Sequence, residues 1–146
     1  MNFSDISDVK KAFEEVYTEI YKTRFWDLPI TNHRLAVQVV GLKETNDFYT
    51  FCLITPWMLN KIAVAKKEDV NVDEIKGMRL DQLEQLGRFW VTNVISPMDG
   101  FTSMEEAVEE GEIQAERLFS EISHEDKQPP RDLSRRDFFR KMSPKN

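Results

Sequence analysis

The sequence predicts one α+β domain, with an antiparallel sheet of about four to five strands and N-terminal and C-terminal helices packed on it. Three observations support this class. Apolar residues recur at helical spacing near both ends of residues 1–126, and the runs between them are β-branched and aromatic. The chain has 146 residues, 40% of them hydrophobic, which is enough for one core. Because helices and strands are segregated along the chain, we expect the helices to cover one face of the sheet.

The first helix is expected to begin at Asp5 or Ser7, since either residue is a good N-cap, and to reach about Arg24. Its apolar side chains follow one another at steps of three and four and form a single stripe: Val9, Phe13, Val16, Tyr17 and Ile20. The Leu28-Pro29 step interrupts this pattern and ends the helical segment.

Two strands and a hairpin turn are predicted next. Leu35–Lys43 is rich in Val and Leu, and Phe48–Thr55 is β-branched and aromatic; residues 44–47 are a turn between them. Asn60–Ala65 predicts a short strand, and the charged segment Lys66–Glu74 predicts an exposed loop.

The following segment, Ile75–Leu86, is ambiguous. Met78 and Leu80 alternate as in a strand, whereas Leu80, Leu83 and Leu86 step by three as in a helix, and we favour the strand. Arg88–Ser96 is a clear strand that Pro97 closes.

The second helix begins with a capping box. Ser103 is the N-cap and Glu106 lies three residues later, so we expect a helix to about Ile122. Its inner face is apolar or small: Ala107, Val108, Gly111, Ala115, Leu118 and Ile122. Glutamates crowd its first three turns: Glu105, Glu106, Glu109, Glu110, Glu112 and Glu116. A Pro-Pro linker follows, and residues 127–146 predict a disordered basic tail.

Charge is distributed unevenly. The net charge is −6, but residues 127–146 carry seven basic and two acidic side chains, so the tail is +5 and the rest is −11. An acidic body argues against nucleic acid as a partner and suits a cationic peptide. No apolar run is long enough to span a bilayer, and the N-terminal segment does not have the pattern of a secretory signal. With one cysteine, Cys52, these features predict a cytoplasmic protein.

Nothing in the sequence points to catalysis. The two histidines, His33 and His124, lie far apart, and no Cys-x-x-Cys pair, phosphate loop or nucleophile elbow is present. Cys52 lies inside a predicted strand, where a cysteine is usually a small buried hydrophobe. The glutamate-rich helix lacks the Glu-x-x-His pairs of di-iron sites. We therefore expect no enzyme, no metal and no cofactor.

Two predicted strands end in the same way. Ile54-Thr55-Pro56 leaves one strand and Ile95-Ser96-Pro97 leaves another, and large apolar residues follow each proline. If both ends lie on one side of the sheet, these residues form a shared apolar rim: Trp57, Met58, Leu59, Met98 and Phe101. A rim rich in methionine and tryptophan can repack around varied apolar peptides. The alternative is that these side chains close the end of the core.

The tail contains Ser134-Arg135-Arg136-Asp137-Phe138-Phe139-Arg140, which resembles the twin-arginine export consensus. No apolar stretch follows it, so it does not predict an export signal. Two interpretations remain open. The segment is either a solvated basic tail or a tethered pseudo-signal, made by Ser134, Arg135, Arg136, Phe138 and Phe139, that docks on the rim when no partner is bound.

These motifs together resemble the HybE family of nickel–iron hydrogenase assembly chaperones, which includes the HupJ proteins. The segment from Cys52 to Leu59 resembles the family's Ile-Thr-Pro-Trp-Met-Leu block, Gly87–Met98 resembles its aromatic strand ending in Ser-Pro, and Ser134–Arg140 resembles its arginine-pair C-terminus. Ala65–Ile75 replaces a Pro-Gly-rich stretch that is common in the family.

The resemblance implies a cytoplasmic chaperone that binds the twin-arginine signal peptide of a hydrogenase small-subunit precursor and delays its export until assembly. Other maturation proteins are further candidate partners. The expected partner-binding residues combine the rim with nearby carboxylates: Pro56, Trp57, Met58, Leu59, Pro97, Met98, Phe101, Glu105, Glu106 and Glu109. Two other classes stay open, namely a small enzyme or ligand carrier, and an obligate subunit of a larger complex.

Overall fold

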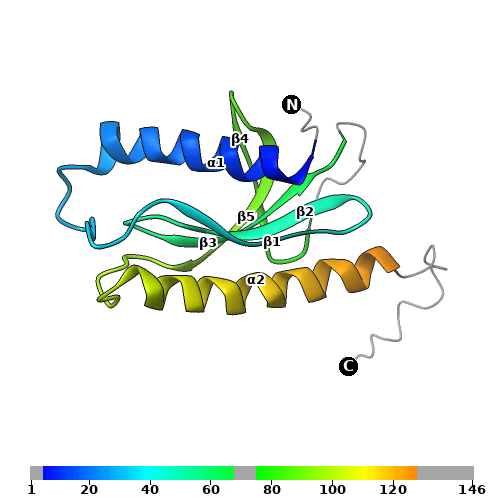
Figure 1. Cartoon of the computed structure of the whole chain (residues 1–146). Helices are drawn as coiled ribbons and strands as arrows, with labels where there is room; N and C mark the ends of the chain where they lie inside the picture. The colour runs from blue at the N-terminus through cyan, green and yellow to red at the C-terminus, as the bar shows by residue number, and fades with distance from the viewer. Residues whose placement is uncertain (1–4, 68–74, 128–146) are drawn as a thin grey trace.

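The computed structural model describes residues 5–67 and 75–127, with side chains to residue 123. A five-stranded sheet has one long helix on each face (Figure 1). The helices are α1 (Ile6–Ile20), continued by a π-helical turn η1 (Tyr21–Phe25), and α2 (Met104–Lys127). The strands are β1 (Gln38–Glu44), β2 (Phe48–Ile54), β3 (Leu59–Ala65), β4 (Arg79–Leu83) and β5 (Gly87–Ile95). Every pairing is antiparallel, in the order β1-β2-β3-β5-β4. The predicted α+β class is confirmed.

The two helices lie on opposite faces of the sheet, which corrects the expectation that both cover one face. All seven residues of β2 are buried. Tyr49, Phe51 and Leu53 pack into the core under α1, whereas Cys52 and Ile54 pack into the core under α2. Successive side chains of a strand point to opposite faces, so a strand that is apolar throughout needs a cover on both.

The α1 side of the core centres on Phe13. Its ring meets Phe51 and Phe89 edge-on, with centroids 5.0 and 5.3 Å apart. Asp5 is the N-cap of α1, because its carboxylate accepts hydrogen bonds from the backbone N–H groups of Ser7 and Asp8, at 2.9 and 3.2 Å. The Ser7 hydroxyl also donates to this carboxylate, at 2.7 Å, and this bond, followed by that from the Asp8 N–H, lowers the pKa of Asp5. The predicted start of this helix at Asp5 is confirmed.

The edge strand β1 is covered by α1. The Val39 N–H donates to the Glu14 carboxylate at 2.9 Å, and the Val39 carbonyl accepts from the Lys10 ammonium at 3.3 Å. Lys10 and Glu14 also pair with each other at 2.5 Å. Two side chains thus occupy the hydrogen-bonding positions that a neighbouring strand would use, which protects this edge from pairing with another chain.

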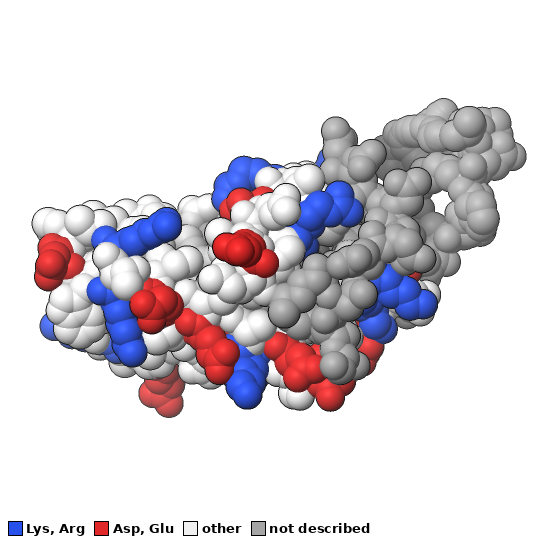
Figure 2. All heavy atoms as spheres, turned by 90° about the horizontal axis from the view of Figure 1, so that it is seen from above, with Lys and Arg blue, Asp and Glu red and all other residues white. Residues whose placement is uncertain are grey.

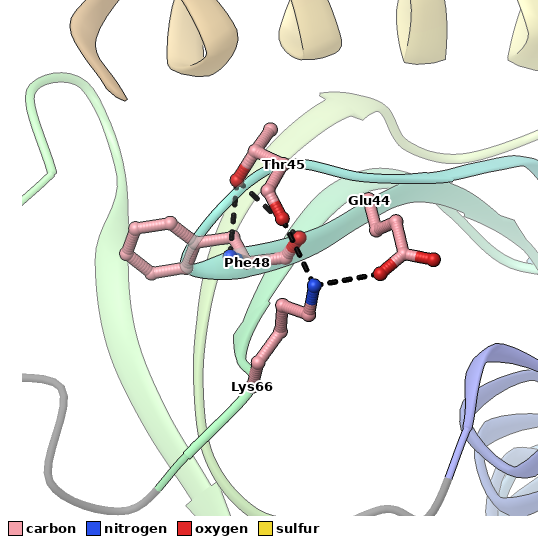
Figure 3. A network of polar contacts seen from close by, with 4 residues as sticks. All are labelled: Glu44, Thr45, Phe48 and Lys66. Carbon is pink, nitrogen blue, oxygen red and sulfur yellow. Dashed lines mark hydrogen bonds and ion pairs between the residues drawn. The ribbon is translucent and has the colours of Figure 1, made fainter. Parts of the chain in front are cut away.

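The end of the sheet that contains the β1–β2 turn is fixed by Lys66 (Figure 3). Its ammonium donates to the Glu44 carboxylate at 2.6 Å and to the Thr45 carbonyl at 3.1 Å. The Thr45 hydroxyl accepts from the Phe48 N–H at 3.0 Å and closes the turn. The bond to Glu44 raises the pKa of Lys66. This network lies at the opposite end of β2 from Thr55 and Pro56.

The predicted strands agree with the structure to within three residues at most boundaries. The ambiguous segment from Ile75 to Leu86 contains the edge strand β4, which confirms the favoured interpretation but limits the strand to Arg79–Leu83. Helix α2 extends five residues beyond the predicted Ile122. Most of the predicted loop Lys66–Glu74 and of the basic tail lies outside the described residues.

Candidate partner-binding site

The two proline-terminated segments lie next to each other. Strands β2 and β5 both pair antiparallel with β3, so they run in the same direction and end at the same end of the sheet. Leu59 of β3 lies opposite both Ile54 and Ile95. The Ser96 hydroxyl donates to the Trp57 carbonyl at 3.4 Å. We call this end of the molecule the proline end, made by residues 25–36, 55–58 and 96–103; it lies at the left of Figure 1.

Asn32 joins the three segments of the proline end. Its backbone N–H donates to the Pro56 carbonyl at 2.8 Å, and its side-chain amide donates to the carbonyls of Met98 and Phe101, both at 2.9 Å. Its side-chain oxygen accepts from the Arg34 N–H at 3.0 Å. Asn32 is 9% exposed, so these bonds satisfy a buried polar group and hold three loops in one arrangement. The sequence analysis did not identify this residue.

Thr55 fixes the turn between β2 and β3. It is fully buried, and its hydroxyl accepts from the N–H groups of Trp57 and Met58, at 3.2 and 2.9 Å. Its own N–H donates to the Met58 carbonyl at 2.9 Å. A threonine hydroxyl that accepts hydrogen bonds from backbone N–H groups two or three residues later commonly stabilises a tight turn. The threonine of this turn thereby sets the backbone position of Trp57.

Trp57, Leu59 and Met98 are buried, with exposed fractions of 6%, 0% and 0%. The Trp57 ring lies parallel to Phe25, with centroids 4.0 Å apart. Met98 packs on the α2 side together with Leu59. These three side chains close the end of the core, so the expectation that they form an exposed rim is corrected. Of the remaining predicted residues, Pro56 is buried, Met58 and Phe101 are half-buried, and Pro97 is exposed.

The exposed apolar surface at this end comes from the segment after η1. Trp26, Leu28 and Ile30 are 53%, 41% and 47% exposed, and we call them the apolar patch. The Trp26 ring lies 4.7 Å from the His33 ring, and the Tyr21 hydroxyl contacts His33 Nδ1 at 2.5 Å. The sequence analysis treated this segment only as a helix break. The available signal was three large apolar residues that alternate with Asp27 and Pro29, in a segment whose proline argues against a strand.

Carboxylates lie at the start of α2, beside this end. The Ser103 hydroxyl accepts from the Glu106 N–H at 3.2 Å, which confirms the predicted N-cap. The Glu106 carboxylate accepts from the backbone N–H and the hydroxyl of Thr102, at 2.8 and 3.0 Å, and these bonds lower its pKa. The side chains of Glu105 and Glu109 are exposed and form no hydrogen bond or ion pair with another residue that the structure describes. A cationic group at this end would therefore meet the Glu106 carboxylate, whose charged form these bonds favour, and the exposed side chains of Glu105 and Glu109.

In the part of the chain that the structure describes, no group of three His, Cys, Asp or Glu side chains could hold a metal ion. Cys52 is buried between β2 and α2, and burial raises the pKa of its thiol to about 12, which keeps it protonated and unreactive. None of the helices in the described ranges is long and apolar enough to cross a membrane. The tail residues Ser134, Arg135, Arg136, Phe138 and Phe139 lie outside these ranges.

Comparison with known proteins gives consistent matches. The model of the HybE family, described as a NiFe-hydrogenase assembly chaperone, matches residues 8–141. The hydrogenase expression/formation protein HupJ of Bradyrhizobium diazoefficiens is 30% identical over 101 residues, which cover 62% of this chain and 60% of HupJ. The solution structure of HybE from Escherichia coli superposes with a TM-score of 0.56 at 19% identity, covering 89% of this chain and 86% of HybE, and shows the same fold.

Proposed function

The chain belongs to the HybE family of NiFe-hydrogenase assembly chaperones, and we propose that it binds the twin-arginine signal peptide of a hydrogenase small-subunit precursor. Binding takes place in the cytoplasm and delays export until assembly is complete. The protein acts by holding this peptide and not by catalysis. The observation that carries the proposal is the proline end, where the loop with the exposed apolar patch is joined through Asn32 to the loop that leads into the carboxylates of α2.

The apolar patch suits the hydrophobic part of a signal peptide. Trp26, Leu28 and Ile30 are each about half exposed, so covering them removes roughly half of each side chain from water. That contributes about 1 kcal/mol per residue, and about 3 kcal/mol for the patch. A contribution of this size changes affinity by about a hundredfold. The Trp26 ring lies 5.2 Å from the Tyr21 ring, which in turn lies 6.1 Å from the ring of buried Trp57, so ring contacts link Trp26 to the core.

The carboxylates suit the arginine pair. Helix α2 begins three residues after Phe101, whose carbonyl accepts from Asn32, so Glu105 and Glu106 follow directly on the loop that is joined to the one carrying the patch. Arginine donates paired hydrogen bonds to a carboxylate, whereas lysine acts as a point charge. A peptide that spans both features would therefore be bound through its apolar segment and selected through its arginines.

Calorimetric titration with a twin-arginine peptide, and with the same peptide carrying two lysines, tests the proposal. We expect the lysine peptide to bind more weakly. Trp26→Ser combined with Ile30→Ser should lower affinity for both peptides at least tenfold. Leu80→Ser is the matched control, because Leu80 is 43% exposed on the edge strand β4, away from the proline end. No binding to the unaltered protein, or equal losses in the two variants, would refute the proposal.

Self-association is the alternative explanation of the apolar patch, since a permanent subunit contact would also be apolar. Sedimentation across a range of concentrations separates the two explanations. A monomer at all concentrations, with peptide binding that depends on Trp26, supports the chaperone role. A concentration-dependent dimer that Trp26→Ser abolishes, without any peptide binding, supports the subunit role.

A further inference from the structure

The outer face of α2 is an unpartnered helix face with an apolar centre. Ile113 is 50% exposed on the side of the helix that points away from the sheet. A shallow hollow surrounds it, lined by Glu109, Glu112, Glu116, Arg117 and Ser120. Glu109 and Glu112 form no ion pair with another described residue, while Glu116 pairs with Lys43 of β1. Figure 1 shows α2 as the outermost layer on its side of the sheet.

We propose that residues 128–146 of this chain fold back along the outer face of α2 and occupy the hollow around Ile113. The tail carries the complementary side chains. Arg135 and Arg136 match the glutamates, and Phe138 and Phe139 match the apolar centre. Residues 127–146 carry a net charge of +5 and the rest of the chain carries −11. The summed field of the body therefore attracts the tail, although salt weakens each individual exposed ion pair.

Chain length permits this contact. The rise from Lys127 back to Glu109 is 18 residues of helix, or about 27 Å. After the Pro129-Pro130 step, an extended chain advances at about 3.3 Å per residue. Arg135 and Arg136 then reach at most about 17–20 Å along the helix, and Phe138 and Phe139 at most about 26–30 Å. Ile113 lies about 21 Å from Lys127, so a slightly contracted chain brings the phenylalanines level with it and the arginines near Glu116.

The other helix offers a less suitable surface. Figure 2 views the molecule from the α1 side and shows blue and red side chains interspersed, with no field of one sign. The hollow on the α1 side is lined by as many basic as acidic residues, namely Lys10, Lys11 and Lys22 with Glu14, Glu15 and Glu19, and Lys10 pairs with Glu14. A basic segment therefore gains less from α1 than from the outer face of α2, where Arg117 is the one basic residue among the side chains that line the hollow.

Tethering makes a weak contact effective. Exposed ion pairs are individually weak, but a short flexible linker raises the effective concentration of the tail to about 1 mM. A contact with an intrinsic dissociation constant of about 0.1 mM would then occupy the face about 90% of the time. Glu109 belongs to both the hollow and the carboxylates beside the proline end, so such occupancy would weaken binding of a cationic peptide that contacts Glu109 about tenfold. This last consequence rests on the proposed function, whereas the docking itself does not.

A spin label on the full chain tests the docking without any peptide. Ser143→Cys provides the attachment site, because Cys52 is buried. We expect paramagnetic broadening of backbone amides in the first three turns of α2, and none around Phe13 on the other face. Glu109→Lys with Glu112→Lys should remove the broadening. Glu15→Lys with Glu19→Lys, an equal charge change on the exposed side of α1, should leave it unchanged.

The competition is measured separately. Arg135→Glu with Arg136→Glu in the full chain should abolish the broadening and strengthen binding of a twin-arginine peptide about tenfold. Broadening that is absent, or equal in both charge-reversed proteins, would overturn the docking. Broadening that is present but unaffected by bound peptide would keep the docking and overturn the competition. A peptide that does not bind at all would contradict the proposed function and leave the docking supported.

Discussion

Two glycines set how closely α2 approaches the sheet, and alanine substitutions can measure this approach. Gly41 lies in a bulge of β1 with φ +67°, and a β-carbon built on it would overlap the β-carbon of Ala115. Gly111 lies inside α2, and its β-carbon would lie 2.7 Å from Cγ2 of Val40. Gly77 has φ +80° but open space around it, and Gly100 has neither feature. An alanine therefore meets both backbone strain and steric overlap at Gly41, strain alone at Gly77, overlap alone at Gly111, and neither at Gly100.

The magnitudes follow from these two terms. Alanine in the left-handed region costs about 1–2 kcal/mol, overpacking costs about 1–3 kcal/mol, and a stiffer unfolded chain returns about 0.4–1 kcal/mol. Gly41→Ala should lower the free energy of unfolding by about 2–4 kcal/mol, and Gly77→Ala by about 1 kcal/mol. Gly111→Ala gains about 1 kcal/mol of helix propensity, so its net loss is about 0–2 kcal/mol. Gly100→Ala should be neutral or slightly stabilising.

Urea unfolding followed by circular dichroism measures these differences, with the slope m checked for constancy. Combining Gly41→Ala with Ala115→Gly should destabilise less than the sum of the single changes, because the second change removes the overlapping atom. If Gly41→Ala and Gly77→Ala destabilise equally, or if the double variant is additive, the close contact between β1 and α2 is not as the structure describes and the reasoning fails.

Three further predictions concern single side chains. Asn32→Ala leaves the carbonyls of Met98 and Phe101 without their buried donor, so it should lower the free energy of unfolding by about 2 kcal/mol in the same urea assay; a loss below about 0.5 kcal/mol would contradict its joining role. The hydrogen bonds of the Glu106 carboxylate stabilise the fold above the ordinary pKa of 4.5, and this stability is lost as pH falls through the lowered pKa of the folded state. Thr102→Val removes the hydroxyl donor and should raise the pKa of Glu106 toward 4.5 in an NMR titration. Burial raises the pKa of the Cys52 thiol from 9.0 to about 12. The neutral thiol therefore contributes its full stability below pH 9.0, and this contribution is lost as pH rises from 9.0 toward 12. A thiol reagent at pH 8 should label Cys52 only as fast as the fold opens, and rapid labelling of the native state would be inconsistent with its burial.

The elements of the fold were accessible from sequence because each carries its own local signal. The Asp5 cap, the apolar stripe through Phe13 and the Ser103 cap define the helices without tertiary information. The placement of the helices on two faces also had a signal, which the sequence analysis did not use. Phe48–Ile54 contains no polar alternation, and a half-exposed strand would need one.

The candidate site was only partly accessible, because exposure depends on contacts between distant segments. The adjacency of the two prolines followed from strand direction, and the sequence shows both motifs. The burial of Trp57 depends on Phe25, which lies 32 residues away, and that of Met98 on Leu35 and Leu59. No pattern within a short window specifies such partners. Asn32 is the extreme case, since its role is defined by two carbonyls more than 60 residues later in the chain.

The burial of Trp57 strengthens the argument for a binding surface at the proline end. Three exposed apolar side chains on an unsupported loop would collapse against one another or onto the core, because exposure to water is unfavourable. Here Asn32 fixes the loop after Ile30, and the Trp26 ring packs against Tyr21 and His33, with the Tyr21 ring in turn 6.1 Å from that of Trp57, so Trp26 is held outside the core. A surface that is apolar, exposed and held in place loses little conformational entropy when a partner covers it. The buried tryptophan thus supports the contact that an exposed tryptophan was expected to make.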